Sequence, residues 1–324
     1  MKKAIISILQ AVIFPLVYTA SQVVVTMIAV VIDSVTLLVN QGADIALYDV
    51  AEMTEELTGG IMGNIVWITL FSCLLTIAVV FIYMSARGLK IRSELRFRKI
   101  GIGTILLSLA VGLVMNFATG YIISVLPIPE QVIADYNELV GDNLFSGGFV
   151  ISFIAMAVVV PFTEELVFRG MSFNFLRRGM ALTLALILQS LLFAGIHMIP
   201  LQVAYVLPTA VTLGLIYMWT DNLIAPVLAH ISYNGFSAII SMLQVTEDAA
   251  EVAETVNYLP HALIAVAIVI GLMYLLYRSR VRPIPVPHHE WKPRKQRFAP
   301  QMPYPGAYPQ PENIQQNGDI SNGQ

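Results

Sequence analysis

The sequence predicts an all-α, polytopic transmembrane helix bundle of about eight spans, followed by a disordered C-terminal tail. Of the 324 residues, 57% are hydrophobic and only 12% are charged, which lies far from the usage of soluble domains. A helix needs about 20 apolar residues to cross about 30 Å of hydrocarbon, and eight segments meet this requirement. These observations, together with charges that gather between the apolar segments, predict an integral membrane protein.

The expected spans follow one another in order, and the first is the longest. Its apolar run extends from Ala4 to Val39, which is too long for one untilted crossing at about 1.5 Å per residue. We expect it to leave the bilayer near Asp33, and we interpret its basic start as an uncleaved signal anchor. The spans are expected at residues 4–32, 61–86, 101–127, 147–168, 180–198, 201–219, 222–243 and 258–277.

The segments between the spans alternate in charge. Basic residues precede the first span and follow the second, fourth and eighth, whereas acidic residues follow the first, third and seventh. Because basic segments stay on the cytoplasmic side, this alternation predicts that both termini are cytoplasmic. We expect the protein in a bacterial plasma membrane, with membrane lipid as a partner.

One stretch places charges inside an expected span, namely VVVPFTEELVFRGMSFNF at residues 158–175. A charged side chain costs about 2.5–3.5 kcal/mol at the bilayer centre on insertion scales, so each charge needs a partner. Glu165 and Arg169 lie one helical turn apart, with the acid first, which favours an ion pair. Glu164 has only Val160 and Phe168 at that spacing. It is therefore expected to be protonated or matched from another helix.

Two further segments supply polar groups at one-turn spacing. Phe193 and His197 lie in the fifth expected span, and His230 and Asn234 lie in the seventh. Helix bundles build polar sites from side chains on facing helices, so we expect these residues to meet Glu164. The other histidines lie at the edge of the last span or in the tail: His261, His288 and His289.

These groups suit hydrolysis of an amide bond by either of two routes. In one, Glu164 or a histidine takes a proton from water, and Asn234 with a histidine N–H stabilises the oxyanion. In the other, His197, His230 and Glu164 bind zinc, which acidifies the water. The residues alone leave both routes open. The single cysteine, Cys73, excludes a cysteine-rich metal site and an intrachain disulfide.

The segments EELVFR, FAGIH and HISYN together resemble the EExxxR, FxxxH and HxxxN motifs of the CPBP family. This family comprises the CAAX proteases and bacteriocin-processing enzymes, which are also called Abi proteins and are related to type II CAAX prenyl endopeptidases. The resemblance implies that Glu164 activates water. It further implies that Glu165, Arg169 and Phe193 support the site, and that His197, His230 and Asn234 complete it. The family is described as metalloproteases, but similar enzymes have been described as glutamate-dependent, so zinc is a possible cofactor and a metal-independent mechanism stays open.

The resemblance divides the chain into three expected regions. Residues 1–145 form an N-terminal region of three spans, residues 146–282 form the CPBP-like catalytic core of five spans, and residues 283–324 form the tail. The tail is rich in proline, glutamine and asparagine and lacks helical periodicity, which is typical of a disordered segment. We expect the tail to be solvated, and a tail-binding partner would be of unknown kind.

The leading hypothesis is an intramembrane endopeptidase that cleaves a membrane-associated protein or peptide, with no nucleic acid as partner. The alternatives are a transporter with an intramembrane polar path and a catalytically silent scaffold or immunity protein. Counting positions along the helices predicts that the fourth helix continues past residue 168 toward the cytoplasm and that the active-site cavity opens there.

Overall fold

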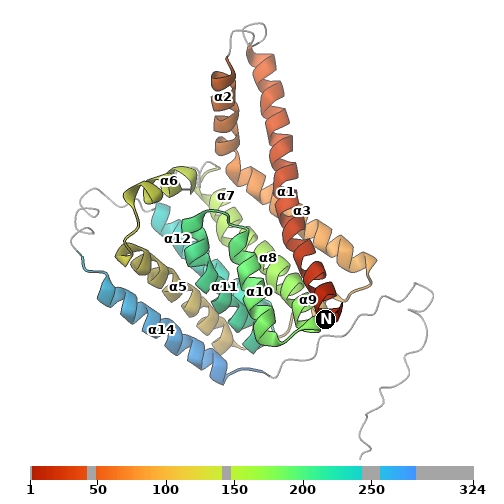
Figure 1. Ribbon diagram of the computed structural model, residues 1–324, viewed down its shortest axis with the longest axis vertical. Helices are drawn as coiled ribbons and strands as arrows, with labels where there is room; N and C mark the ends of the chain where they lie inside the picture. The colour runs from red at the N-terminus through yellow and green to blue at the C-terminus, as the bar shows by residue number, and fades with distance from the viewer. Residues whose placement is uncertain (1, 42–48, 141–146, 243–255, 282–324) are drawn as a thin grey trace, which may run out of the picture. The chain divides into compact units, whose positions relative to one another are not determined.

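The computed structural model describes residues 2–41, 49–140, 147–242 and 256–281, and within these ranges every regular element is a helix (Figure 1). Seven helices are long and apolar enough to cross a membrane. The prediction of an all-α polytopic membrane protein is therefore confirmed. Six of the seven are α1 (Lys2–Gln41), α3 (Ile65–Ala86), α5 (Ile102–Val125), α11 (Pro200–Thr220), α12 (Ile224–Met242) and α14 (Leu259–Arg278). The expected tail, residues 283–324, lies outside the described residues.

The seventh long helix runs without a break from Phe149 to Gly179, so it continues past residue 168 as expected. Two stretches of it have π-helical hydrogen bonding, one on each side of Glu164 and Glu165. Such wide turns are rare and frequently occur at functional sites. In chain order its parts are α7 (Phe149–Phe153), η2 (Ile154–Val159), α8 (Val160–Glu165), η3 (Leu166–Phe173) and α9 (Asn174–Gly179).

The remaining expected span, residues 180–198, is a shorter helix. α10 (Leu182–Gly195) has 14 residues, or about 21 Å, which is less than the thickness of the hydrocarbon core. The chain leaves the helix in a tight turn, where Ile199 N–H donates to the carbonyl of His197 and Met198 has a φ of 59°. His197 therefore lies in a turn just after α10 and not within a helix.

Three shorter helices lie in segments that were expected to connect the spans. α2 (Val50–Gly63) begins with a capping box in which Asp49 and Glu52 each accept the other's backbone N–H. α4 (Ile91–Glu94) is one turn long, and α6 (Glu130–Val140) follows the third span. α1 does not end near Asp33 but continues to Gln41, and its second half lies beside α2 (Figure 1).

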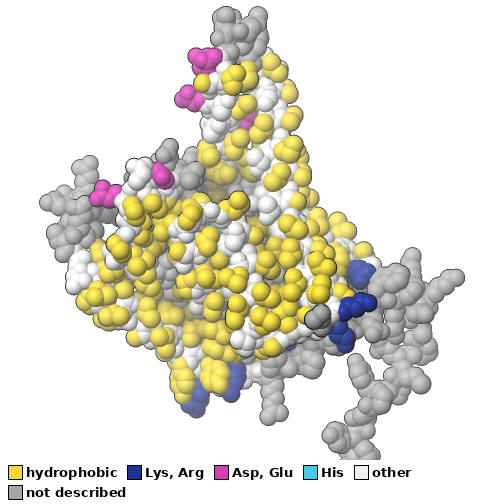
Figure 2. All heavy atoms as spheres, in the orientation of Figure 1, with side chains coloured by type: hydrophobic (Ala, Val, Ile, Leu, Met, Phe, Trp, Pro, Cys, Tyr) yellow, Lys and Arg dark blue, Asp and Glu magenta, His cyan; other side chains and the backbone are white. Residues whose placement is uncertain are grey.

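Charge separates along the bundle, as the sequence predicts. Figure 2 shows basic side chains at one end of the helices and acidic side chains at the other. At the basic end Asp221 is buried and pairs with three arginines, with shortest N–O distances of 2.6 Å to Arg96, 3.0 Å to Arg98 and 3.8 Å to Arg177. This cluster joins the segment before α5, the end of α9 and the turn between α11 and α12.

α5 and α12 pack very closely at one point beside the polar groups. A Cβ atom added to Gly112 of α5 would overlap the carbonyl oxygen of Ala229 on α12. His230 is the next residue on α12, so the closest approach of these helices sets the position of this histidine.

We expect Gly112→Ala to destabilise the protein by about 1–3 kcal/mol, because the added methyl must push α5 and α12 apart. Thermal unfolding in detergent measures the effect. Gly103→Ala is the matched control, since Gly103 lies on the same helix with nothing within 4 Å of the added atom, and it should be neutral or stabilising by up to about 1 kcal/mol. Equal unfolding temperatures for the two variants would contradict this packing.

Candidate active site

Glu165 and Arg169 form a fully buried ion pair. Arg169 Nη1 lies 2.8 Å from Glu165 Oε1, and both side chains are inaccessible to solvent. Arg169 Nη2 donates to the Ala210 carbonyl at 2.9 Å, and the guanidinium lies 4.6 Å from the centre of the Phe193 ring. The pairing expected from the one-turn spacing is therefore present, and it also attaches the fourth span to α11 and α10.

His230 lies between the two glutamates. Its Nδ1 is 3.0 Å from Glu165 Oε1, and its Nε2 is 3.7 Å from Glu164 Oε2. The contact with Glu165 is a hydrogen bond, whereas the atoms in the contact with Glu164 are too far apart for a direct hydrogen bond. An ionised Glu165 only accepts hydrogen bonds, so it fixes the ring with the Nδ1 proton toward itself and Nε2 toward Glu164.

Glu164 is buried, with 6% of the residue exposed, and its partners come from other helices. Oε2 faces His230, and Oε1 accepts a hydrogen bond of 3.4 Å from the hydroxyl of Tyr18 on α1. As expected, the groups that lie next to the Glu164 carboxylate come from other helices, namely α1 and α12. No motif or helical spacing in the sequence predicts this contact of Tyr18.

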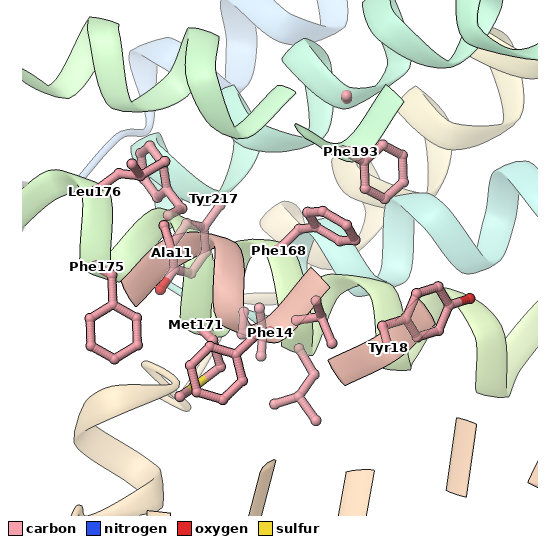
Figure 3. Close-up of a cluster of buried hydrophobic side chains, with 14 of the residues drawn as sticks. Ala11, Phe14, Tyr18, Phe168, Met171, Phe175, Leu176, Phe193 and Tyr217 are labelled. Atoms are coloured by element: carbon pink, nitrogen blue, oxygen red, sulfur yellow. The ribbon is translucent and has the colours of Figure 1, made fainter. Parts of the chain in front are cut away.

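Phe193 lies at the centre of the aromatic contacts around the site. Its ring meets that of Phe168 edge to face at 4.9 Å, as Figure 3 shows, and lies 5.3 Å from the His197 ring and 6.0 Å from the His230 ring. The Phe193 carbonyl oxygen is 2.9 Å from His197 Nδ1. A carbonyl only accepts, so His197 Nδ1 carries a proton and Nε2 is left for other partners.

Asn234 lies one turn after His230 on α12. Its Nδ2 donates to the carbonyl of Met156 in η2 at 3.2 Å. A carboxamide has a second N–H and an acceptor oxygen, so one donor is left beyond this bond. The contact therefore holds the amide against the fourth span while leaving it able to bind another group.

One cavity of about 440 Å³ brings five of the seven predicted site residues together: Glu164, Phe193, His197, His230 and Asn234. Glu165 and Arg169 do not line it, because they lie buried behind His230 and Phe193. The residues assigned to catalysis thus share a cavity, and the supporting ion pair is separated from it.

The cavity extends toward the acidic end of the bundle, not toward the basic end as the helix count had suggested. Its lining includes Ile123 and Ser241 near the ends of α5 and α12, Gln202 near the start of α11, and Tyr136 on α6. Toward the basic end, packed side chains and the arginine cluster around Asp221 fill the space.

The three residues predicted to bind zinc, His197, His230 and Glu164, line one cavity but are not close enough together to hold an ion as they stand. In the described part of the chain, no three His, Cys, Asp or Glu side chains are grouped so that they could hold a metal ion. A zinc site built from protein ligands needs at least three donors directed at one point. Zinc binding by His197, His230 and Glu164 therefore stays a prediction.

Comparison with known proteins gives two matches. Residues 146–236 match the family model for type II CAAX prenyl endopeptidase Rce1-like proteins, and all seven predicted site residues lie in this segment. The membrane-embedded CAAX protease MroQ of Staphylococcus aureus (strain USA300) is 30% identical over 115 residues, which are 34% of this chain and 46% of that protein. The match thus spans less than half of this relative. No solved structure matches the chain.

We expect Arg169→Met to destabilise the protein by about 3–5 kcal/mol, because it leaves the buried Glu165 carboxylate without its cation. Adding Glu165→Gln to this variant should restore part of the loss, since it removes the unpaired charge. Thermal unfolding in detergent compares the single and double variants. Arg278→Met, at an exposed residue of α14, is the control and should change stability by less than about 0.5 kcal/mol. A single variant as stable as this control would refute the role of the pair.

Proposed function

We propose that the protein is an intramembrane endopeptidase, from the premise that residues 146–236 match the type II CAAX prenyl endopeptidase Rce1-like family model. One observation carries the proposal. A buried glutamate and a histidine from different helices face each other across 3.7 Å at the wall of a cavity that two more polar groups, His197 and Asn234, also line. Packing alone gives no reason to place such groups around one cavity in a membrane protein.

The proposed reaction begins with a water molecule shared by Glu164 Oε2 and His230 Nε2. The two atoms are too far apart to bond directly and close enough to hydrogen-bond the same water. Glu164 takes a proton from this water as general base, and the oxygen attacks the carbonyl carbon of the scissile peptide bond. Glu164 then gives the proton to the leaving amine nitrogen as the C–N bond breaks.

The remaining groups stabilise charge and hold the base in position. The tetrahedral intermediate carries its negative charge on the former carbonyl oxygen, where preorganised donors have their largest effect. Asn234 offers its second N–H, and His197 donates from Nε2 when it is protonated. Glu165 accepts from His230 Nδ1 and is itself neutralised by Arg169, so it orients the histidine without adding net charge.

The proposed substrate is a membrane-associated protein or peptide that enters from the acidic end. This end carries the mouth residues Tyr136, Gln202 and Ser241. The positive-inside rule puts it on the outer side of the membrane, with both termini in the cytoplasm. Because Glu164 lines the same cavity as these residues, a peptide that enters here would approach the buried carboxylate.

A transporter is expected to pair inverted repeats with broken helices around a midplane site that opens to each side of the membrane in turn. The sequence shows no such repeat, and the described lining residues of the cavity lead from Glu164 toward the acidic end. A silent scaffold would have no need of Glu164. Burying an ionisable side chain in a membrane protein costs stability, and a scaffold gains nothing in return. Both alternatives therefore explain fewer of the contacts than proteolysis does.

We expect Glu164→Gln to lower kcat/KM by about 10²–10⁴-fold, because an amide cannot take the proton from water. The measurement is cleavage of a panel of membrane-associated peptides by protein reconstituted in liposomes. Glu94→Gln is the control, since Glu94 is an equally buried glutamate that pairs with Arg178 away from the cavity. Cleavage by Glu164→Gln at the wild-type rate would exclude this mechanism.

We expect the purified protein to keep its activity after chelation, because Glu164 Oε2 and His230 Nε2 are placed to share a water that Glu164 deprotonates without a metal. Metal content and cleavage rate are measured on the same sample before and after treatment with a chelator. A known zinc protease treated in parallel is the control for metal removal. Activity that disappears on chelation and returns with added zinc would establish the metal-dependent route instead.

A further inference from the structure

Tyr18 lies outside the segment that matches the family model, yet it contacts the residue proposed as the general base. It belongs to α1, and only 4% of the residue is exposed. Its hydroxyl donates to Glu164 Oε1 at 3.4 Å, while the other carboxylate oxygen faces His230. Tyr18 does not line the cavity, so it approaches Glu164 from the side opposite to the substrate.

The position of Tyr18 follows from the packing of one face of α1. Ala11, Phe14 and Tyr18 recur at helical spacing and are all buried. Ser172 Oγ donates to the Ala11 carbonyl at 2.8 Å, and the Phe14 ring stacks on Phe175 at 5.8 Å. Figure 3 shows the three α1 residues beside the segment that carries Phe168 and Met171. Because this face is attached to the fourth span at several points, Tyr18 has little freedom to move away.

A carboxylate that serves as a base must present one oxygen to water in a fixed direction. A glutamate side chain turns easily about its last bond, and on the cavity side His230 Nε2 lies 3.7 Å from Glu164 Oε2, too far to hold the carboxylate by a direct hydrogen bond. A carboxylate oxygen attracts a hydroxyl donor more strongly than a neutral acceptor does, and the contact from Tyr18, although long at 3.4 Å, supplies such a donor. A donor on Oε1 of Glu164 therefore keeps Oε2 directed toward His230 and the shared water.

We propose that Tyr18 is a positioning residue that holds the Glu164 carboxylate in its reactive orientation, so that α1 is part of the active site as well as a membrane span. This inference rests on the proposed function, in which Glu164 is the general base. It assigns a role in the reaction to the N-terminal region, to which neither the sequence motifs nor the family match extends.

The first test is the kinetics of Tyr18→Phe, which removes the hydroxyl and keeps the ring. We expect kcat to fall about tenfold with KM within about twofold of wild type, since the hydrogen bond is lost and the substrate cavity is intact. Tyr217→Phe is the matched control. Tyr217 is fully buried and donates to Asn174 at 3.1 Å, away from the cavity, so this variant should retain kcat. Wild-type kcat in Tyr18→Phe, or an equal loss in both variants, overturns the proposal.

The second test measures stability, so that the contact between Tyr18 and Glu164 can be tested without a substrate and independently of the proposed function. Unfolding temperatures are measured for Tyr18→Phe, Glu164→Leu and the double variant. If the two groups interact, the shift in unfolding temperature of the double variant differs from the sum of the shifts of the two single variants. Additive shifts overturn the contact, whatever the activity. Full cleavage by Glu164→Leu combined with non-additive shifts would instead overturn the proposed function and confirm the contact.

Discussion

At membrane depth, the Glu165 carboxylate accepts hydrogen bonds from both Arg169 and His230, and most of the site geometry depends on this arrangement. Removing ions from water costs several kcal/mol per charge, and a buried pair recovers this only with good geometry and additional hydrogen bonds. Here the arginine also bonds to the Ala210 carbonyl and covers the Phe193 ring. Residues from four helices thus meet at one neutralised pair.

Because this pair is costly to rearrange, it acts as a fixed support for the histidine. His230 Nδ1 is held by Glu165, so Nε2 must face Glu164. The close approach of Gly112 to Ala229 sets α12 at the right depth. A rigid support behind a reactive group is what catalysis by preorganised dipoles requires.

The fourth span gives two neighbouring glutamates different surroundings. Adjacent residues on a helix point about 100° apart, so Glu165 faces the arginine and α12 while Glu164 faces α1 and the cavity. The π-helical stretches on either side widen the turns at this point, and η2 also offers the Met156 carbonyl to Asn234. One carboxylate is thereby neutralised by its ion pair, and the other lies beside the cavity, where the proposed function uses it.

Local patterns in the sequence predicted much of this protein. Hydropathy located the long helices, since each needs only its own apolar residues to be stable in lipid, and one-turn spacing predicted the Glu165–Arg169 pair. Five of the seven residues that the three motifs selected line the cavity, although their catalytic roles stay predictions. The helices within the acidic connections were missed, since their acidic residues keep their hydropathy below that of a span. α10 was expected to be longer than it is, because an apolar run does not show where a turn begins.

By itself, then, the sequence determined the fold class, the spans and the residues that need a polar partner. Tertiary structure alone decided which partners they have: Tyr18 meets Glu164 across 146 positions in the chain, and His230 meets Glu165 across 65. It also decided that the cavity extends toward the acidic end. The physical reason is that spacing along one helix fixes only which side chains share a face, whereas the contacts between faces depend on how distant helices pack together.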